Sequence, residues 1–290
     1  MKFVVFEAGS RAGFSAEMFF LDYVKKSGNK NDILYMVDDS LQVNNVESCE
    51  NVRRITLKEF LDLDKKGFVI FPADELTRQS NPVVNGIANE NEISKVKSSY
   101  YNKENTNLKL ELLTYGCRIK IPKTFAFDKV CVRPNSMSAG SKGLQLLDNV
   151  SITEKINIVE EYVVDVLRCD DYMRLYPRAV VLKNGYDRLV KPLREDSEIG
   201  VAAREFILEA QPDNKGLFSN IFHLQLAKDD LGDLYYIESS KRISGTSIVN
   251  LSRGMNPFCF IMGMQIYEET STFQYDKWYR YEDFIKVLDI

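Results

Sequence analysis

Residues 223–242 read HLQLAKDDLGDLYYIESSKR, and this stretch decides the fold class of the C-terminal half of the chain. Two short runs rich in apolar and β-favouring residues, 224–227 and 234–237, flank the turn sequence Asp-Asp-Leu-Gly. This pattern predicts an antiparallel β-hairpin. Because paired runs of the same kind begin near Lys129, we expect an α+β arrangement in this half of the chain.

Side-chain alternation along this hairpin predicts a small polar cluster. His223 and Gln225 fall on one face of the first strand, and Tyr236, Glu238 and Ser240 fall on one face of the second. If the hairpin pairs these two faces, Gln225, Glu238 and Ser240 converge. Their amide, carboxylate and hydroxyl oxygens are donors that Mg²⁺ uses when it keeps several waters and bridges to phosphates. The alternative for Glu238 is a solvated residue on a strand edge.

A second candidate site is the segment 134–143, PNSMSAGSKG, which lies between predicted strands at 129–133 and 144–147. Its small residues leave backbone N–H groups able to approach an anion closely. Arg133 offers a guanidinium fork for phosphate oxygens, and Lys142 adds a second cation. The spacing is not that of a Walker A loop, and a flexible hairpin loop is the competing interpretation.

The first seventy residues have a different pattern. Four short strands are predicted, at residues 2–6, 33–37, 52–55 and 68–71. A helix with apolar residues at i, i+4 and i+7 from Phe14 follows the first strand, and Gly28 is placed to end it. Thr56 and Glu59 have the spacing of a capping box that begins a second helix. Alternating strands and helices indicate βαβ units around a parallel sheet, which is a Rossmann-like lobe.

The glycines after the first strand, Gly9 and Gly13, do not have the spacing of a dinucleotide fingerprint, so we interpret them as a tight turn. A dehydrogenase is therefore not expected. Residues 81–106 are mostly polar and mark the boundary of the first lobe.

Composition excludes several classes of protein. The chain has 290 residues, a hydrophobic content of 44% and a formal net charge of -4. Neither a basic stripe nor a membrane span is apparent, so we expect no nucleic acid and no membrane partner. Five scattered cysteines fit a reducing cytoplasm. With His223 as the only histidine and no G-x-S-x-G motif, Ser-His-Asp hydrolysis is not expected.

These fragments, in this order, resemble the ATP-grasp superfamily, in particular carboxylate-amine ligases and the large chain of carbamoyl phosphate synthetase, in a short form. The matching segments are Asn102-Lys103-x-x-Thr106, Ile121-Pro122-Lys123-Thr124, Val132-Arg133-Pro134 with Gly140-Ser141-Lys142-Gly143, Val159-Glu160-Glu161-Tyr162-Val163, Pro177-Arg178, Gln225 with Glu238 to Gly245, and Gly254-x-Asn256-Pro257.

The resemblance implies a set of nucleotide-binding residues. The residues implied for the phosphates are Lys103, Arg133, Ser138, Gly140, Ser141, Lys142 and Gly143. Those implied for adenine, through the main chain, are Glu160, Glu161, Tyr162 and Val163. Glu160 or Glu161 would also take the ribose.

The resemblance also implies the metal-binding and catalytic residues. Gln225 and Glu238 would bind Mg²⁺, with Mn²⁺ as an alternative ion, and Ser240 stands where the family has a metal-binding asparagine. Arg178 and Arg242 would stabilise the transferred phosphoryl group and the acyl phosphate that follows.

The implied architecture is an N-terminal Rossmann-like lobe, residues 1–92, followed by a two-lobed ATP-grasp region, residues 93–290, with a small nucleotide lid at about 125–165. ATP would lie between the two ATP-grasp lobes. The acceptor pocket would lie between residues 72–75 and residues 242–256, beyond the carboxyl ends of the first-lobe strands.

The implied function is an ADP-forming ligase that joins a small carboxylic acid to an amine, such as an amino acid or peptide, or to a thiol, through an acyl phosphate. The alternative is a degenerate ATP-grasp module that binds nucleotide without ligase activity and serves as a regulatory or assembly partner. The resemblance leaves a homodimeric assembly open.

Overall fold

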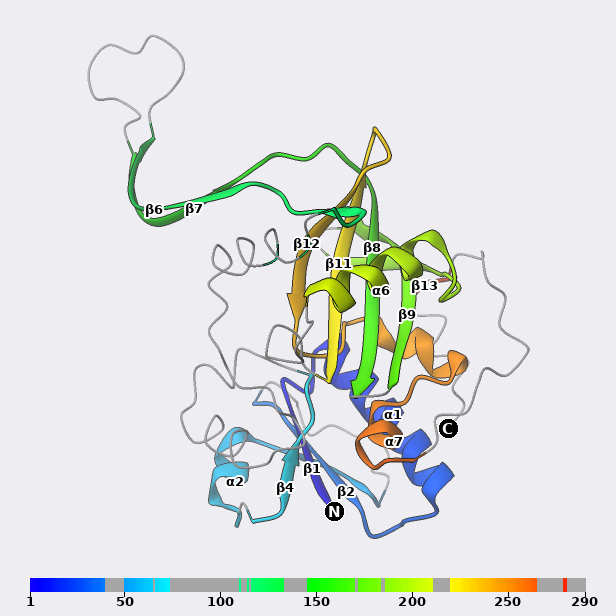
Figure 1. The fold of residues 1–290 in the computed structure, drawn as a ribbon. Helices are drawn as coiled ribbons and strands as arrows, with labels where there is room; N and C mark the ends of the chain where they lie inside the picture. The colour runs from blue at the N-terminus through cyan, green and yellow to red at the C-terminus, as the bar shows by residue number, and fades with distance from the viewer. Residues whose placement is uncertain are drawn as a thin grey trace.

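The fold consists of three β-sheets with helices packed on two of them (Figure 1). The computed structural model describes residues 1–39, 50–64, 66–73, 110, 114, 116–132, 145–169, 172–183, 186–210, 220–264 and 279–280. A four-stranded sheet forms the lower lobe, a seven-stranded sheet lies above it, and a two-stranded sheet extends away from the upper lobe. In this part of the chain, none of the helices combines the length and the apolar character needed to cross a bilayer.

The lower sheet is parallel, in the order β3-β2-β1-β4. Its strands are β1 (Lys2–Phe6), β2 (Ile33–Val37), β3 (Val52–Ile55) and β4 (Phe68–Ile70). The helices of this lobe are α1 (Arg11–Ser27) and α2 (Leu57–Asp62). The predicted Rossmann-like lobe is confirmed, with β4 one residue shorter than expected.

The turn that leads into α1 explains the two glycines after β1. The Ser10 side chain caps the helix by accepting a hydrogen bond from the Gly13 N–H at 3.0 Å. A Cβ atom added at Gly13 would lie 2.6 Å from the Ala8 carbonyl oxygen, so only glycine allows the helix to approach the turn this closely. The tight-turn interpretation is confirmed for Gly9, whereas Gly13 lies in the first turn of α1.

Other helix ends also follow the predicted signals. Gly28 ends α1 in the left-handed conformation, with a φ of 66°. Thr56 and Glu59 form the capping box of α2, in which each side chain accepts from the other residue's backbone N–H.

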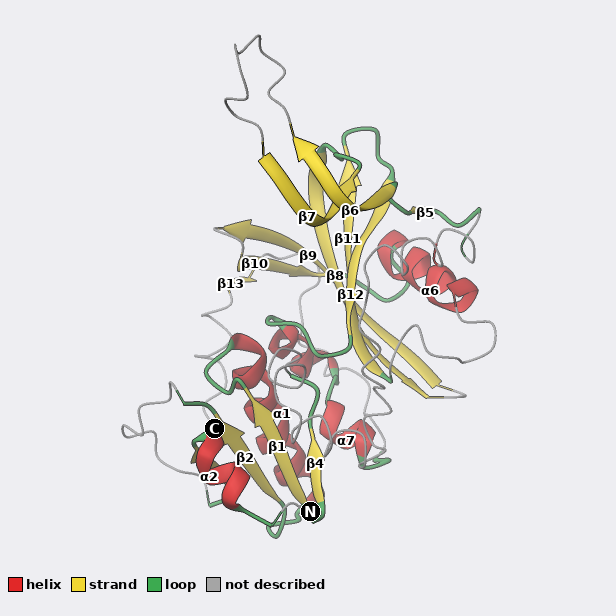
Figure 2. Cartoon of the chain, turned by 90° about the vertical axis from the view of Figure 1, so that its left-hand side faces the viewer, coloured by secondary structure: helices red, strands yellow, loops and turns green. Residues whose placement is uncertain are grey.

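The upper sheet has the order β13-β10-β9-β8-β11-β12-β5, and all its pairs are antiparallel except β12 with β5. Its strands are β5 (Ile119–Lys120), β8 (Ile158–Cys169), β9 (Tyr172–Lys183), β10 (Tyr186–Pro192), β11 (Ile221–Asp229), β12 (Leu234–Ser240) and β13 (Tyr279–Arg280). Helix α6 (Glu198–Ala210) covers one face (Figure 2). The separate sheet pairs β6 (Thr124–Val132) with β7 (Gln145–Thr153).

The predicted hairpin is confirmed as β11–β12, but the face predicted for the Tyr236 side chain is wrong. Gln225 lies opposite Glu238, and the register then shifts between Gln225 and Leu226 because β12 carries one extra residue. Tyr236 consequently points to the α6 face, where it stacks on Phe206 at 5.6 Å, and does not share a face with Glu238. The cause is a β-bulge, which no pattern of strict alternation can predict.

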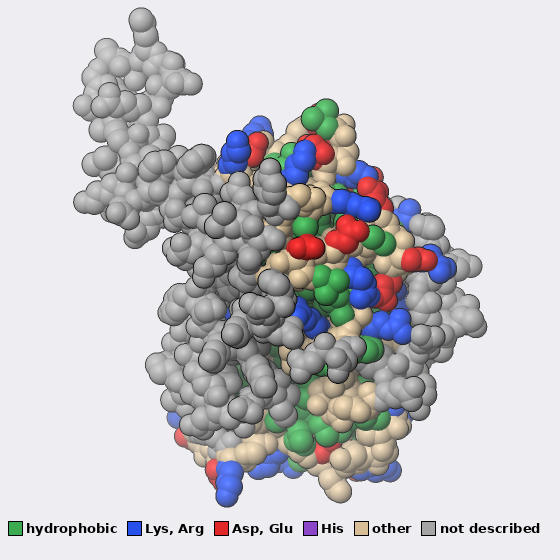
Figure 3. Space-filling model, viewed as in Figure 1, with side chains coloured by type: hydrophobic (Ala, Val, Ile, Leu, Met, Phe, Trp, Pro, Cys, Tyr) green, Lys and Arg blue, Asp and Glu red, His purple; other side chains and the backbone are tan. Residues whose placement is uncertain are grey.

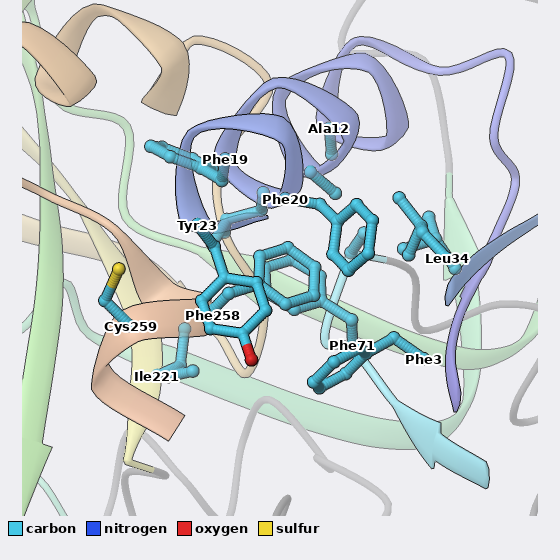
Figure 4. Packing of buried hydrophobic residues seen from close by; sticks show 14 of the residues in the cluster. Phe3, Ala12, Phe19, Phe20, Tyr23, Leu34, Phe71, Ile221, Phe258 and Cys259 are labelled. Carbon is cyan, nitrogen blue, oxygen red and sulfur yellow. The ribbon is translucent and has the colours of Figure 1, made fainter. Parts of the chain in front are cut away.

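The C-terminal segment completes the core of the lower lobe (Figure 4). After β12 come a 3-10 helix, η2 (Ser247–Arg253), and a short helix, α7 (Pro257–Ile261). The Phe258 ring on α7 is fully buried, stacks on Phe71 at 4.1 Å and meets Phe3 edge-on at 5.1 Å. Strand β1 and helix α7 therefore share one core, although they lie far apart in the sequence. The predicted boundary at residues 92 and 93 lies outside the described residues.

Replacing Phe258 with alanine should destabilise the protein by about 3 to 5 kcal/mol, because a fully buried ring is lost between aromatic neighbours that cannot close the cavity. Urea unfolding measures the change. The matched control is Phe260→Ala on the same helix, where the ring is only half-buried against this core and stacks on Tyr172 at 6.1 Å, so its loss should cost less than half as much. Equal costs for both variants would contradict a core role for Phe258.

Candidate functional site

The candidate site is built on the face of the upper sheet opposite α6. Two neighbouring rows of cross-strand partners cross β9, β8, β11 and β12 on this face. The rows consist of Arg178, Val163, Gln225 and Glu238, and of Tyr176, Asp165, His223 and Ser240. Directly opposite residues of antiparallel strands have Cβ atoms about 4.5 to 5.5 Å apart, so Gln225 lies within reach of Glu238. His223 likewise lies within reach of Asp165 and Ser240, whereas Val163 separates Arg178 from Gln225.

The predicted metal ligands come together in this arrangement. Gln225 and Glu238 are direct partners, the first half-buried and the second exposed. Ser240 is buried one row further along, opposite His223. Within the described residues, no three His, Cys, Asp or Glu side chains form a metal-binding group. One carboxylate with one amide suits Mg²⁺, which completes its coordination with water and substrate phosphates.

His223 has a structural contact. Its Nδ1 lies 2.9 Å from the Arg242 carbonyl oxygen, and since a carbonyl only accepts, Nδ1 carries the proton. Burial, followed by the charge of Arg242, lowers the pKa of His223 to about 4. The imidazole is therefore neutral at physiological pH and anchors the base of the loop after β12.

That loop connects the upper sheet to the lower lobe. The Ile243 N–H donates to the Pro72 carbonyl at 3.0 Å, just beyond the end of β4, and the Cβ position of Gly245 lies 3.3 Å from the Cβ of Arg11. The strand order of the lower sheet places its topological switch point between β1 and β4. The half-buried Arg242 thus lies in a loop that contacts the lower lobe at the residues just beyond β4.

Arg178 is held internally. Its side chain has no exposed surface, and each of its three guanidinium nitrogens has a partner. Nη1 donates to Asp165 at 2.6 Å, Nε donates to the Thr246 hydroxyl at 3.0 Å, and Nη2 donates to the Ser244 hydroxyl. In this arrangement the guanidinium faces the loop after β12.

The residues implied for adenine and ribose lie in the first half of β8. From Glu161 to Leu167 each residue has partners on both β9 and β11, whereas in the described structure residues 158–160 are flanked by β11 only. Glu160 and Glu161 point to opposite faces. The Glu160 carboxylate accepts a hydrogen bond from Tyr162 on the α6 side, and Glu161 shares the face of Gln225. Tyr162 and Val163 are both buried.

The remaining predicted phosphate ligands lie outside the described residues. They are Lys103, Arg133, Ser138, Gly140, Ser141, Lys142 and Gly143. The antiparallel pairing of β6 with β7 ends at Val132 and Gln145, so the strands that flank the glycine-containing segment are confirmed.

Sequence reasoning missed the buried polar residues around Arg178. Asp165 is fully buried and accepts hydrogen bonds from Arg178, from the Ser244 N–H at 3.3 Å and from the Asn250 amide at 2.9 Å. The available signal was a single carboxylate inside the apolar run YVVDVL, since a charge in a buried strand requires a partner.

Charges are mixed on the surface that carries α6. Figure 3 shows Lys and Arg side chains beside Asp and Glu side chains over the upper lobe. Arg118 with Glu205 and Lys228 with Glu198, each at 3.3 Å, are examples. This described surface therefore presents no single-sign field that would steer a polyanion.

The lowered pKa of His223 predicts a pH-dependent stability. The folded state keeps the imidazole neutral, but the unfolded chain takes up a proton below the ordinary pKa of 6.5. The contribution of His223 to the free energy of unfolding is complete above pH 6.5. It falls by on the order of 3 kcal/mol as the pH is lowered toward 4. His223→Asn, which retains a donor, should lack this loss. Urea unfolding of both proteins between pH 4 and 7 measures it, and a pH-independent difference between them would contradict the assignment.

Comparisons with known proteins bear on the fold. No family model and no curated protein matches the sequence. Among solved structures, a putative ATP-grasp superfamily protein from Archaeoglobus fulgidus matches with a TM-score of 0.57 and 13% identity, covering 93% of this chain and 90% of that chain. An L-amino acid ligase from Bacillus licheniformis matches with a TM-score of 0.55 and 15% identity, covering 94% and 76%.

A third match is N5-carboxyaminoimidazole synthase from Aspergillus clavatus, solved with ADP and 5-aminoimidazole ribonucleotide. Its TM-score is 0.59 at 14% identity, with coverage of 92% of this chain and 77% of that chain. At such identities the likeness concerns the fold, and it extends over both lobes. The predicted α/β architecture is confirmed, and the fold of this chain is similar to that of solved ATP-grasp proteins.

Proposed function

We propose that this protein is an ATP- and Mg²⁺-dependent, ADP-forming ligase that joins a small carboxylic acid to an amine. The observation that carries the proposal is the Gln225–Glu238 pair on the face opposite α6, beside a loop that carries Arg242 and contacts the lower lobe at Pro72. This arrangement supports a metal-binding pair close to the loop that we propose borders the acceptor site.

The nucleotide assignment is supported by the solved relatives. The carboxyaminoimidazole synthase was solved with ADP, and the L-amino acid ligase is named for joining amino acids. We propose that Lys103, Arg133 and the loop residues Ser138 and Gly140 to Gly143 contact the phosphates. For the ribose we favour Glu161 over Glu160, because Glu161 shares the face of Gln225 while Glu160 binds the Tyr162 hydroxyl.

The metal proposal depends on the donor chemistry of the paired strands. Glu238 would supply the charge that balances the cation, and Gln225 would supply a neutral oxygen. Ser240 would take part only from the neighbouring row, opposite His223. When bound, Mg²⁺ neutralises charge on the transferring phosphates.

The proposed chemistry has two steps. The acid carboxylate attacks the γ-phosphorus of ATP, the bond to the β-phosphate oxygen breaks, and ADP leaves behind an acyl phosphate. The amine then attacks the acyl carbon, phosphate leaves, and the amine loses a proton; a thiol acceptor would follow the same course. Arg242, held at its carbonyl by His223, would stabilise charge on the transferred group.

The competing function is a nucleotide-binding module without ligase activity. It is favoured by Ser240, which stands where the family carries an asparagine and lies one row away from the Gln225–Glu238 pair. A product assay separates the two functions.

Incubation with Mg-ATP and pairs of small acids and amino acids should release ADP and phosphate. Hydroxylamine should trap the acyl phosphate as a hydroxamate, because it is a strong nucleophile toward acyl carbon. Chromatography of the nucleotides and a colorimetric hydroxamate assay measure both products. Release of AMP and pyrophosphate would instead indicate an adenylating enzyme, and nucleotide binding without either product would favour the non-catalytic module.

Glu238→Gln should abolish most of the thermal stabilisation by Mg-ATP, because it keeps the shape but removes the balancing charge. A ligand at a hundred times its Kd stabilises a protein by about 2.7 kcal/mol. For a chain of this size that corresponds to a rise in Tm of roughly 4 °C. The matched control, Glu205→Gln on α6, should keep the full rise. If Glu238→Gln responds like the parent protein, Glu238 is not a metal ligand.

A further inference from the structure

We propose that Asp165 and Arg178 are a positioning pair that fixes the loop 241–246, and with it Arg242, over the face carrying Gln225 and Glu238. The pair acts through the loop and does not itself contact the transferred phosphoryl group. This proposal rests on the proposed function and reassigns Arg178 within it.

The first observation is the complete burial of both charges. Neither Asp165 nor Arg178 has any exposed side-chain surface, and their closest atoms lie 2.6 Å apart. Removing two charges from water costs more than their mutual attraction returns unless every remaining hydrogen-bonding group is also satisfied. Such a pair is weak support for stability, so its hydrogen bonds indicate what it holds in place.

Those hydrogen bonds converge on one segment. Arg178 donates to the Ser244 and Thr246 hydroxyls, and Asp165 accepts from the Ser244 N–H and the Asn250 side chain. Both partners of the ion pair thus bind residues 244–250 of the loop and η2. The Ser244 and Ser247 hydroxyls lie 3.1 Å apart and brace the loop from within.

We call the hydrogen bonds from Asp165 and Arg178 to residues 244–250 the clamp. A second set of hydrogen bonds extends it. The Arg253 guanidinium, also buried, donates to the Asn250 side chain at 2.9 Å, to the Pro177 carbonyl at 3.1 Å and to the Leu193 carbonyl at 2.6 Å. Pro177 directly precedes Arg178 on β9. Arg253 therefore ties the end of η2 to β9 at Pro177 and to the residue that follows β10.

The position of the pair connects it to the candidate site. Arg178 shares a row with Gln225 and Glu238, and Asp165 shares the neighbouring row with His223, which holds the Arg242 carbonyl. The loop is thus held before Ile243 by His223 and after it by the ion pair, while Ile243 itself contacts Pro72. These three contacts fix the backbone of the loop, and with it the position from which the Arg242 side chain extends.

The test compares two ways of altering the pair. Asp165→Leu with Arg178→Met removes both charges but keeps apolar volume, a change that buried ion pairs commonly tolerate. Arg178→Lys keeps a charge for Asp165 but lacks the fork that reaches Ser244 and Thr246. The control is Glu17→Leu with Arg54→Met, which removes a 2.6 Å ion pair between α1 and β3 of the lower lobe.

Three readouts are expected to separate. In the double variant and in Arg178→Lys, kcat for ADP release should fall about 100-fold, since small misplacements of a catalytic group have effects of this size. The KM for ATP should change less than about threefold, because the interactions that hold ATP equally in the ground state and in the transition state are unaffected. Hydrogen exchange of residues 243–250 should become at least roughly tenfold faster through local opening, with other protected amides unchanged. The control should match the parent protein in all three.

The proposal is overturned if the double variant keeps parental exchange in residues 243–250, or if kcat, ATP affinity and exchange throughout the chain all change together. Should the double variant fail to fold, Thr246→Val removes one bond of the clamp at nearly constant volume, and its exchange in 243–250 decides the question. If the parent releases no ADP with any acid and amine, the proposed function fails, while the exchange readout still tests the clamp.

Discussion

The register of β11 between β8 and β12 is the constraint on which the candidate site depends. A slip of one residue would carry Gln225 and His223 to the α6 face and bring the buried Leu224 and Leu226 to the site. Because those leucines pack in the core under α6, the slip would cost burial on one face and expose apolar surface on the other. Packing between α6 and the sheet thus fixes which residues form the polar row on the opposite face.

The bulge in β12 resolves a conflict within a single strand. With regular alternation Tyr236 and Glu238 would share a face, so either the aromatic ring would leave the core or the carboxylate would enter it. The extra residue lets Tyr236 stack on Phe206 while Glu238 lies opposite Gln225. A local irregularity of this kind is typical of sheet positions next to functional sites.

Local signals in the sequence were sufficient for most of the lower lobe. The Thr56 capping box, the ending of α1 at Gly28 and the strand limits of β1, β2 and β3 depend on neighbours in sequence, and each was predicted. The partners of Asp165 could not be predicted, since Ser244 and Asn250 lie about eighty residues away and come near it only through the sheet order. The same holds for Phe258, whose contacts with Phe3 join opposite ends of the chain.

The distribution of these long-range contacts bears on where the protein can move. The loop after β12 is bonded to β4 through Ile243, to β8 and β9 through the Asp165–Arg178 pair, and α7 is fixed in the lower core by Phe258. Separating this loop and α7 from the sheets would expose the buried Asp165–Arg178 pair and the aromatic side chains around Phe258 together. Exposing either of them costs free energy. The described β6 and β7 strands pair only with each other and form a sheet of their own. If nucleotide binding requires closure between lobes, we therefore expect the β6–β7 side to move and the loop after β12 to stay in place, so that Arg242 occupies the same position before and after closure.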